Sequence, residues 1–223
     1  MKKLFLMSLV MVLGLSACVQ NSKPKPKVGD KKFYDVIYTM DDTIKKLSLV
    51  VEIMDVTDST VTSSQTYTYL DSGEIISNLY TSKIEGEYTE LPLKSLFAKH
   101  LASFGDNLEI VEGSNTIKYL NDMSESTTLE PARLVLKAVS DTTEVMIELA
   151  VKDRNVYGSE KITIPVGTFD CVKFSETHIA EIGDNEIFTK ITCWYDKDSN
   201  LLRQTDSSKD GKVYYEVILT KME

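Results

Sequence analysis

Residues 157–174 place the strongest constraint on the fold of this chain. They read Tyr-Gly-Ser-Glu-Lys-Ile-Thr-Ile-Pro-Val-Gly-Thr-Phe-Asp-Cys-Val-Lys-Phe, and apolar and polar side chains alternate on both sides of a Pro-Val-Gly break. Such alternation is typical of two antiparallel strands joined by a tight turn. Pro165 presets the backbone of a turn, and Gly167 can adopt the positive φ that closes a short hairpin. The stretch predicts a β-hairpin and contains no catalytic pattern.

The same residues carry a family resemblance. The run from Val156 to Cys171 resembles the signature of the TapB-like lipoproteins of Bacteroidetes, a domain-of-unknown-function group in which x-G-x-E-x-x-x-x-P-A-G-T-F-x-C precedes a C-terminal β-meander. The resemblance covers the C-terminal third of the chain and departs at Val166, where Ala is usual. It implies a fold and an envelope compartment, with no known activity. The matching residues are Gly158, Glu160, Pro165, Gly167, Thr168, Phe169 and Cys171.

The N-terminus has the form of a lipoprotein signal. Lys2 and Lys3 precede an apolar run over residues 4–15, and Leu-Ser-Ala-Cys closes the run at Cys18. The run is too short to span a bilayer comfortably, and its order of basic, apolar and small residues is that of a secretory signal. A Cys directly after the small residues resembles the bacterial lipobox, which implies removal of residues 1–17 and lipidation of Cys18. The alternative is an ordinary signal peptide that is cleaved near a cysteine.

Lipidation of Cys18 predicts that the chain contacts a membrane through its N-terminal lipid. Several acyl chains on one residue anchor a protein stably, because a single chain binds only marginally. No Asp follows Cys18, which in lipoproteins generally favours the outer membrane, and the acidic cluster that marks surface export is absent. We therefore expect an outer-membrane lipoprotein that faces the periplasm. Residues 18–30, in which Pro and Lys alternate over 22–27, predict an extended tether.

The body of the chain, residues 31–223, is predicted to form one domain, because its length suits a single core of useful size. The formal net charge is −9. This charge excludes nucleic acid as a partner, since phosphate binding requires clustered Lys and Arg. Solubility is the simplest reason for the acidity.

Strand-like alternation recurs through this body. Runs rich in Val, Ile, Thr and Tyr are separated by breaks that contain Asp, Ser and Gly, as expected of successive hairpins. The polar residues 121–131 predict a loop or flap.

The predicted fold class is mainly β (α+β), with a curved antiparallel sheet or half-barrel. Besides the hairpin, the predicted strands are residues 32–40, 44–55, 60–70, 74–82, 108–111, 116–120, 133–139, 144–151, 187–195, 201–205 and 213–221.

One main helix is predicted over residues 93–104. Its apolar residues recur at steps of three and four, which gives one apolar face. Pro92 stands at its start and Gly105 just past its end, as helix punctuation should. A curved sheet with one helix on its concave face is similar to the lipoprotein-carrier half-barrels. If the helix fits the curve imperfectly, a candidate ligand groove remains, lined by Leu93, Leu96, Phe97, Leu101 and Phe104.

Cys171 and Cys193 are the two cysteines outside the N-terminal signal, in a compartment expected to be oxidising. Both residues are the same number of positions from residue 182, so a hairpin centred at residue 182 would place them opposite each other. Hydrophobic facing instead favours a shift of one residue, which puts the two side chains on opposite faces of the sheet. The register leaves a disulfide and two buried free thiols as alternatives.

Motifs of known chemistry are missing from the sequence. It contains no nucleophile elbow, zinc-protease motif, C-x-x-C pair or phosphate-binding loop. The residues Asp196-x-Asp198-x-Asn200 resemble the start of a calcium loop. An EF-hand then needs Gly and Glu where this chain has Leu201 and Ser207, so a hairpin turn is favoured.

Only two histidines are present, His100 and His178. His100 lies beside the apolar helix face, where a packing role is favoured over catalysis because no nucleophile motif accompanies it. Glu176 and His178 share one strand face. The pair could form half of a metal site, and an exposed strand edge explains it equally well. The sequence therefore predicts no enzyme, no cofactor and no metal.

Two hypotheses from different classes remain. The first is a module that binds a lipid or another hydrophobic ligand in the candidate groove. The second is a structural or interaction module in which the helix fills the sheet, and an exposed strand edge or the 121–131 loop contacts an envelope protein.

Overall fold

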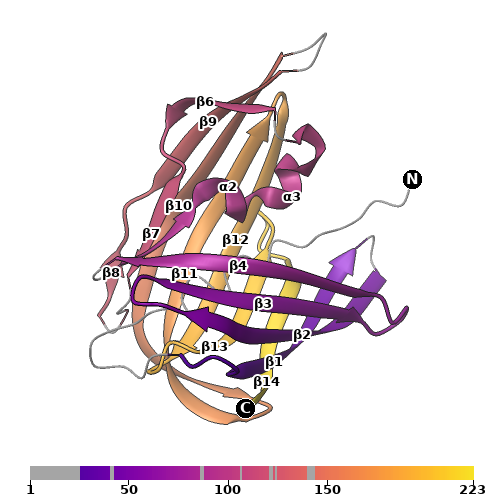
Figure 1. Ribbon diagram of the computed structural model, residues 1–223, viewed down its shortest axis with the longest axis vertical. Helices are drawn as coiled ribbons and strands as arrows, with labels where there is room; N and C mark the ends of the chain where they lie inside the picture. Colours follow the sequence, from indigo (N-terminus) through magenta and orange to yellow (C-terminus); the bar gives the residue numbers. More distant parts are fainter. Residues whose placement is uncertain are drawn as a thin grey trace.

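The computed structural model describes residues 26–40, 43–85, 88–105, 107–120, 123, 125–139 and 144–223. Residues 1–17, Cys18 and most of the tether lie outside them, so lipidation stays a prediction. The described chain forms one curved antiparallel sheet that does not close into a barrel, with short helical turns over its concave side (Figure 1). The predicted fold class is confirmed.

The sheet contains fourteen strands in the described chain, and neighbours along the sequence are mostly neighbours in space. The spatial order is β6-β9-β10-β11-β12-β13-β14-β1-β2-β3-β4-β5-β7, with β8 beside β10. The strands are β1 (Lys31–Met40), β2 (Thr43–Val56), β3 (Thr60–Tyr69), β4 (Ile75–Glu85), β5 (Tyr88–Pro92), β6 (Leu108–Gly113), β7 (Thr116–Leu120), β8 (Thr127–Thr128), β9 (Ala132–Val139), β10 (Glu144–Ile164), β11 (Gly167–Ile182), β12 (Asn185–Asp196), β13 (Leu201–Ser207) and β14 (Val213–Met222).

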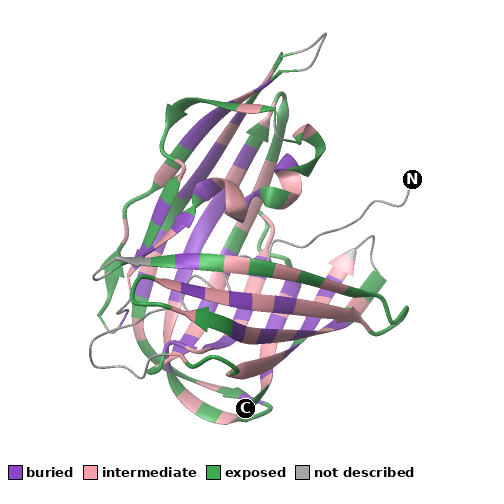
Figure 2. Cartoon of the chain, in the orientation of Figure 1, coloured by how far each residue is buried: buried purple, intermediate pink, exposed green. Residues whose placement is uncertain are grey.

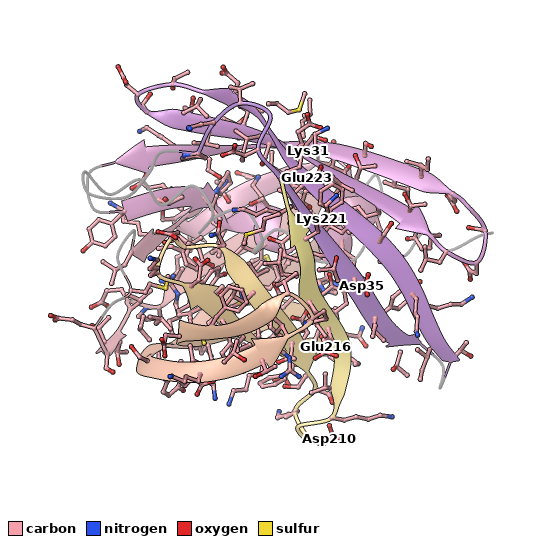
Figure 3. The ribbon with its side chains drawn as sticks, turned by 90° about the horizontal axis from the view of Figure 1, so that it is seen from below. Lys31, Asp35, Asp210, Glu216, Lys221 and Glu223 are labelled. Carbon is pink, nitrogen blue, oxygen red and sulfur yellow. The ribbon has the colours of Figure 1, made fainter. Side chains whose placement is uncertain are left out.

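The first and last strands join the two halves of the sheet. The backbone N–H of Lys31 donates to the carbonyl of Glu223, and the N–H of Glu223 donates to the carbonyl of Lys31, both at 2.9 Å. Figure 3 shows these two residues side by side where β1 and β14 meet. The pairing makes the sheet continuous from the N-terminal meander to the C-terminal meander.

The core lies on the concave side of the sheet. In β2, Leu47, Leu49, Val51 and Ile53 are buried while the residues between them are not, which is the period of two expected of a half-buried strand (Figure 2). Each such aliphatic side chain contributes about 1.5–3 kcal/mol through its burial. Side chains from both halves of the sheet and from the helical turns belong to the same core cluster.

The helical segment, residues 93–104, lies where the sequence predicts it but is not one continuous helix. It consists of α2 (Leu93–Leu96), α3 (Ala98–Leu101) and a 3-10 turn, η1 (Ala102–Phe104). The break falls at Phe97, whose φ of −113° and ψ of 13° are not helical. A straight helix of this length would extend about 18 Å. The break lets the apolar side chains follow the curved sheet, and Gly105 ends the segment with a φ of 58°.

Candidate functional site

Four of the five residues of the candidate groove line no described hollow, and the fifth, Leu101, lines one together with other residues. Leu93, Leu96, Phe97 and Leu101 are buried in the main core cluster, and Phe104 is partly buried against it. The apolar face of the helical segment is therefore filled by contacts with the concave side of the sheet. The break at Phe97 adapts the segment to the curve, and ligand binding at these residues stays a prediction.

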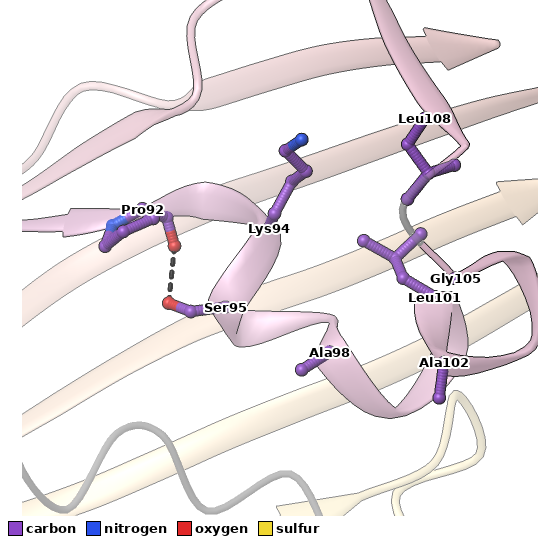
Figure 4. A pocket seen from close by; sticks show the side chains of 8 residues that line it. All are labelled: Pro92, Lys94, Ser95, Ala98, Leu101, Ala102, Gly105 and Leu108. Atoms are coloured by element: carbon purple, nitrogen blue, oxygen red, sulfur yellow. Dashed lines mark hydrogen bonds between the residues drawn. The ribbon is translucent and has the colours of Figure 1, made fainter. Parts of the chain in front are cut away.

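A hollow of about 440 Å³ lies beside the helical segment (Figure 4). Of the predicted groove residues, it includes only Leu101. The Ser95 hydroxyl donates to the carbonyl of Pro92 at 2.5 Å, so that side chain is already engaged by the turn. The lining residues are Pro92, Lys94, Ser95, Ala98, Leu101, Ala102, Gly105 and Leu108.

A buried polar cluster connects β7, β10 and β11. We call it the Glu176 cluster, and its members are Tyr119, Arg154, Glu176 and His178. The Tyr119 hydroxyl donates to Glu176 Oε1 at 2.9 Å, and Arg154 Nε donates to Glu176 Oε2 at 3.1 Å. His178 Nε2 lies 2.5 Å from Glu176 Oε1. Glu176 and His178 thus occupy the core. The interpretation of the pair as an exposed strand edge was wrong, and no set of side chains fit for a metal occurs in the described chain.

Arg154 uses all three of its nitrogens in this Glu176 cluster. Besides the bond to Glu176, its two terminal nitrogens donate to the carbonyls of Glu130 at 2.6 Å and Lys118 at 2.7 Å. The guanidinium also lies 4.7 Å from the centre of the Tyr119 ring. Burial alone would raise the pKa of Glu176, but His178 and Arg154 outweigh it and lower the pKa. The cluster is a satisfied ion pair that holds three strands together, with no acid or base left for a substrate.

Asp206 is the second buried acid of the concave face. Gln204 Nε2 donates to its Oδ1 at 2.8 Å. Burial raises the pKa of Asp206 to about 7, although Gln204, His178 and Lys99 oppose the shift. Lys99 comes from the helical segment, and burial lowers its pKa. Burial also lowers the pKa of the neighbouring His100 to about 4, so that this imidazole is neutral at pH 7.

Cys171 and Cys193, the two cysteines of the described chain, are free and buried. The strand register explains why the candidate disulfide does not form. The hairpin between β11 and β12 places Ile182 opposite Asn185, so Cys171 lies opposite Asp196 and Cys193 opposite Phe174. The offset is odd, and the two thiols point to opposite faces of the sheet. Of the alternatives left by the sequence, the structure has the buried free thiols.

The signature residues build a hairpin that extends β10 and β11 beyond the neighbouring strands, at the bottom of Figure 1. Ile164 pairs with Gly167, which leaves Pro165 and Val166 as the turn, as predicted. The Glu160 carboxylate accepts a hydrogen bond from the Trp194 indole, and the Cys171 thiol donates to the Glu160 carbonyl at 3.3 Å. These contacts give the signature residues a structural role.

The outer edge of β4 over residues 75–82 is an open strand edge. β3 pairs with one side of β4 along this stretch, whereas β5 pairs with the other side only from Lys83 to Glu85. Within the described chain no strand pairs with the outer side of residues 75–82. Ile75 and Leu79 are 65% and 69% exposed there. We call this stretch the open edge.

Other edges of the sheet carry protective features. β6 is short, contains Glu109 and Glu112, and has a bulge before Glu112. The outer side of β7 supplies the Lys118 carbonyl that Arg154 binds. Charge, bulges and short length are the usual means by which proteins block pairing at an edge. The open edge has none of these over its eight residues, Ile-Ile-Ser-Asn-Leu-Tyr-Thr-Ser.

The fold and these sites define a single-sheet β protein with a hydrogen-bonded cluster around Glu176 in its core and an uncharged open edge along β4. The chain belongs to the DUF3108-like family, whose model matches residues 31–219. Its structure is similar to that of a candidate lipoprotein from Parabacteroides distasonis, with a TM-score of 0.60 and 19% identity over 88% of this chain and 96% of that one. A candidate exported protein with a YmcC-like fold from Bacteroides fragilis has a TM-score of 0.58 and 15% identity, with the same coverage of both chains. No curated protein matches the sequence.

Sequence reasoning missed Arg154 and Asp206, and it missed the lack of a neighbour along β4. Arg154 and Asp206 are single charged residues in alternating strands, and only the register shows that both side chains point inward. The sequence of residues 75–82 gave only a weak signal for the open edge, because the predicted strand 60–70 is also uncharged and also contains an exposed aliphatic residue, Leu70. The described residues contain no helix that is long and apolar enough to cross a membrane.

Proposed function

We propose that the chain is a TapB-like lipoprotein of the outer membrane, held by lipid at Cys18 and facing the periplasm, that acts by binding a protein rather than by catalysis. The observation that carries this proposal is the open edge of β4, which has no paired strand in the described chain, carries no charge and exposes Ile75 and Leu79. An extended segment of a partner can add to such an edge through main-chain hydrogen bonds, while alternate side chains set specificity.

The other polar groups of the chain support binding over chemistry. Glu176 is fully engaged by Tyr119, Arg154 and His178 inside the core. Asp206 is buried and bonded to Gln204. A catalytic acid or base must reach a substrate, which these enclosed carboxylates do not. The lipobox residues ending in Cys18 and the envelope neighbours of similar fold support the compartment.

The test is photo-crosslinking in cells of the full-length protein, with a photoreactive amino acid in place of Leu79. The matched control places the same group at Val213, an exposed aliphatic residue of β14 that lies away from the open edge. We expect one dominant crosslinked protein at position 79, and its loss when Ser77→Lys adds a charge to the edge. A diffuse smear, or a product that is equal at positions 79 and 213, would contradict the proposal.

A second candidate function is binding of a hydrophobic ligand or lipid. The hollow beside the helical segment supports it, because its volume of about 440 Å³ falls within the range of small-molecule sites. Native mass spectrometry of protein purified without detergent tests this candidate. A lipid mass that is lost on denaturation and absent from Ala98→Trp, which fills the hollow, would support it. A mass without ligand at every collision energy would count against it.

A further inference from the structure

We propose that two copies of this chain pair through β4, edge to edge and antiparallel, so that the partner of the open edge is a second copy. This inference rests on the proposed function, because it names the partner that the open edge binds. It places the interface at residues 75–82 and makes the sheets of the two copies continuous. A two-fold axis relates the copies, so that the same residues contribute from each side.

The backbone of the open edge has unused hydrogen-bonding capacity. In an antiparallel strand every second residue directs its N–H and C=O to one side, and the groups directed to the other side here meet β3. The outward groups of residues 75–82 have no strand beside them in the described chain. A second β4 supplies donors and acceptors at the same spacing, since it is the same strand reversed.

Charge favours a second copy at this place. The chain has a formal net charge of −9, so two copies repel each other over most surfaces. Residues 75–82 contain no Asp, Glu, Lys or Arg. Like charges that face each other across paired strands are destabilising, and this stretch of β4 creates no such pair with itself. The open edge is therefore a place where two acidic copies can approach without direct repulsion.

The exposed aliphatic residues select a register. Opposed residues in antiparallel strands lie on the same face of the sheet, so Ile75, Ser77 and Leu79 meet the same set in the other copy. With the two-fold axis at Ser77, Ile75 lies opposite the partner's Leu79, and this apolar contact occurs twice. These are the two most exposed aliphatic side chains of residues 75–82. The pairing covers both of these side chains. It also uses the open edge of each copy, so no open edge is left for a third copy and the assembly stops at a dimer.

Local concentration also favours the dimer. Both copies hold their lipid at Cys18 in one membrane under the proposed function, which confines them to a layer. Tethering of this kind converts weak pairing into a populated complex, because the effective concentration rises without any new contact. A short edge-to-edge interface, which would be weak in dilute solution, can then be occupied at the membrane.

Disulfide trapping of the full-length protein in its own membranes tests the inference. Cysteine is placed singly at positions 75, 77, 79 and 81, and a mild oxidant is added. Opposed Cα atoms of antiparallel strands lie about 4.5–5.5 Å apart, within disulfide range. Only a residue on the two-fold axis meets itself, so we expect Ser77→Cys to give at least a fivefold larger dimer fraction than Thr81→Cys. Val213→Cys is the exposed control, and the native Cys171 and Cys193 are buried.

A second substitution separates pairing from chance collision. Adding Leu79→Lys to Ser77→Cys places a charge against the partner's Ile75 and should abolish the dimer, whereas adding Val213→Lys should leave it intact. Equal dimer formation at positions 77 and 213, or no dimer at any position of β4, overturns the inference. If β4 gives no dimer while photo-crosslinking at position 79 captures a protein of different mass, the proposed function stands without self-pairing. If neither method yields a product, both fail.

Discussion

Arg154 Nε lies 3.1 Å from Glu176 Oε2, and these side chains are only 2% and 0% exposed. A buried ion pair is costly to desolvate, and it persists when further hydrogen bonds satisfy both groups. Here Tyr119, His178 and two backbone carbonyls do so. The pair ties the short strand β7 and the segment before β9 to the long strand β10.

Removal of one partner of this pair should destabilise the protein strongly. Arg154→Met leaves the Glu176 carboxylate buried without its cation, and we expect a loss of about 3–5 kcal/mol in the free energy of unfolding. Urea denaturation measures this loss. The control is Arg133→Met, which breaks the exposed pair with Glu148 and should cost about 1 kcal/mol or less. Equal losses in the two variants would show that the Glu176 cluster is not a structural clamp.

Asp206 should make stability depend on pH. Its folded pKa is about 7, above the ordinary value of 3.8, because burial disfavours the charged form. The stability from the neutral acid is therefore fully present below about pH 4 and is lost as pH rises through 7. In Asp206→Asn the acid is absent but the acceptor for Gln204 is kept. Relative to wild type, the free energy of unfolding of the variant should rise by on the order of 4 kcal/mol between pH 4 and pH 8. Parallel stability curves for the two proteins would refute the assignment.

Two glycines with similar backbones should respond differently to Ala. Gly113 and Gly211 have φ values of 86° and 84°, so both substitutions incur backbone strain of about 1 kcal/mol. A Cβ at Gly113 would lie 2.3 Å from the carbonyl oxygen of Arg133, whereas one at Gly211 would meet nothing within 4 Å. We expect Gly113→Ala to cost several times more than Gly211→Ala in thermal unfolding. Similar melting temperatures would contradict the close packing of β6 on β9.

The thiols of Cys171 and Cys193 should be unreactive in the folded protein. Burial raises the pKa of Cys171 to about 11 and that of Cys193 well above its usual range, and the thiolate is the reactive form. Alkylation should label neither residue under native conditions and both after denaturation without a reductant. A reductant should not change the melting temperature. If the denatured protein is alkylated only after a reductant is added, Cys171 and Cys193 form a disulfide and the strand register is different.

The sequence predicted the β-strands and their breaks well, because half-buried strands carry a period of two that a reader can follow. It placed the hairpin at Pro165 and Gly167 and the turn after Asp196, whose carboxylate accepts bonds from the N–H groups of Asp198 and Asn200. Local patterns are sufficient for such features because the interacting residues are close in the chain.

Long-range features were harder to predict. The Glu176 cluster joins Tyr119 to a residue 57 positions away, which no local pattern encodes. Periodicity predicted the apolar face of residues 93–104, but it could not show that the sheet buries most of that face. The open edge depends on where β5 leaves β4, and this departure is a property of the sheet rather than of residues 75–82 themselves.

Hydrogen exchange of residues 75–82 tests the central claim most directly, since it reports on the backbone groups of the open edge. An unpaired edge exchanges quickly, and pairing protects the outward amides. The account predicts that protection of these residues in the solubilised full-length protein rises with protein concentration and is lost in Leu79→Lys, while residues 60–68 of the paired strand β3 do not change. Fast exchange of the outward amides at every concentration, identical in wild type and Leu79→Lys, would contradict it.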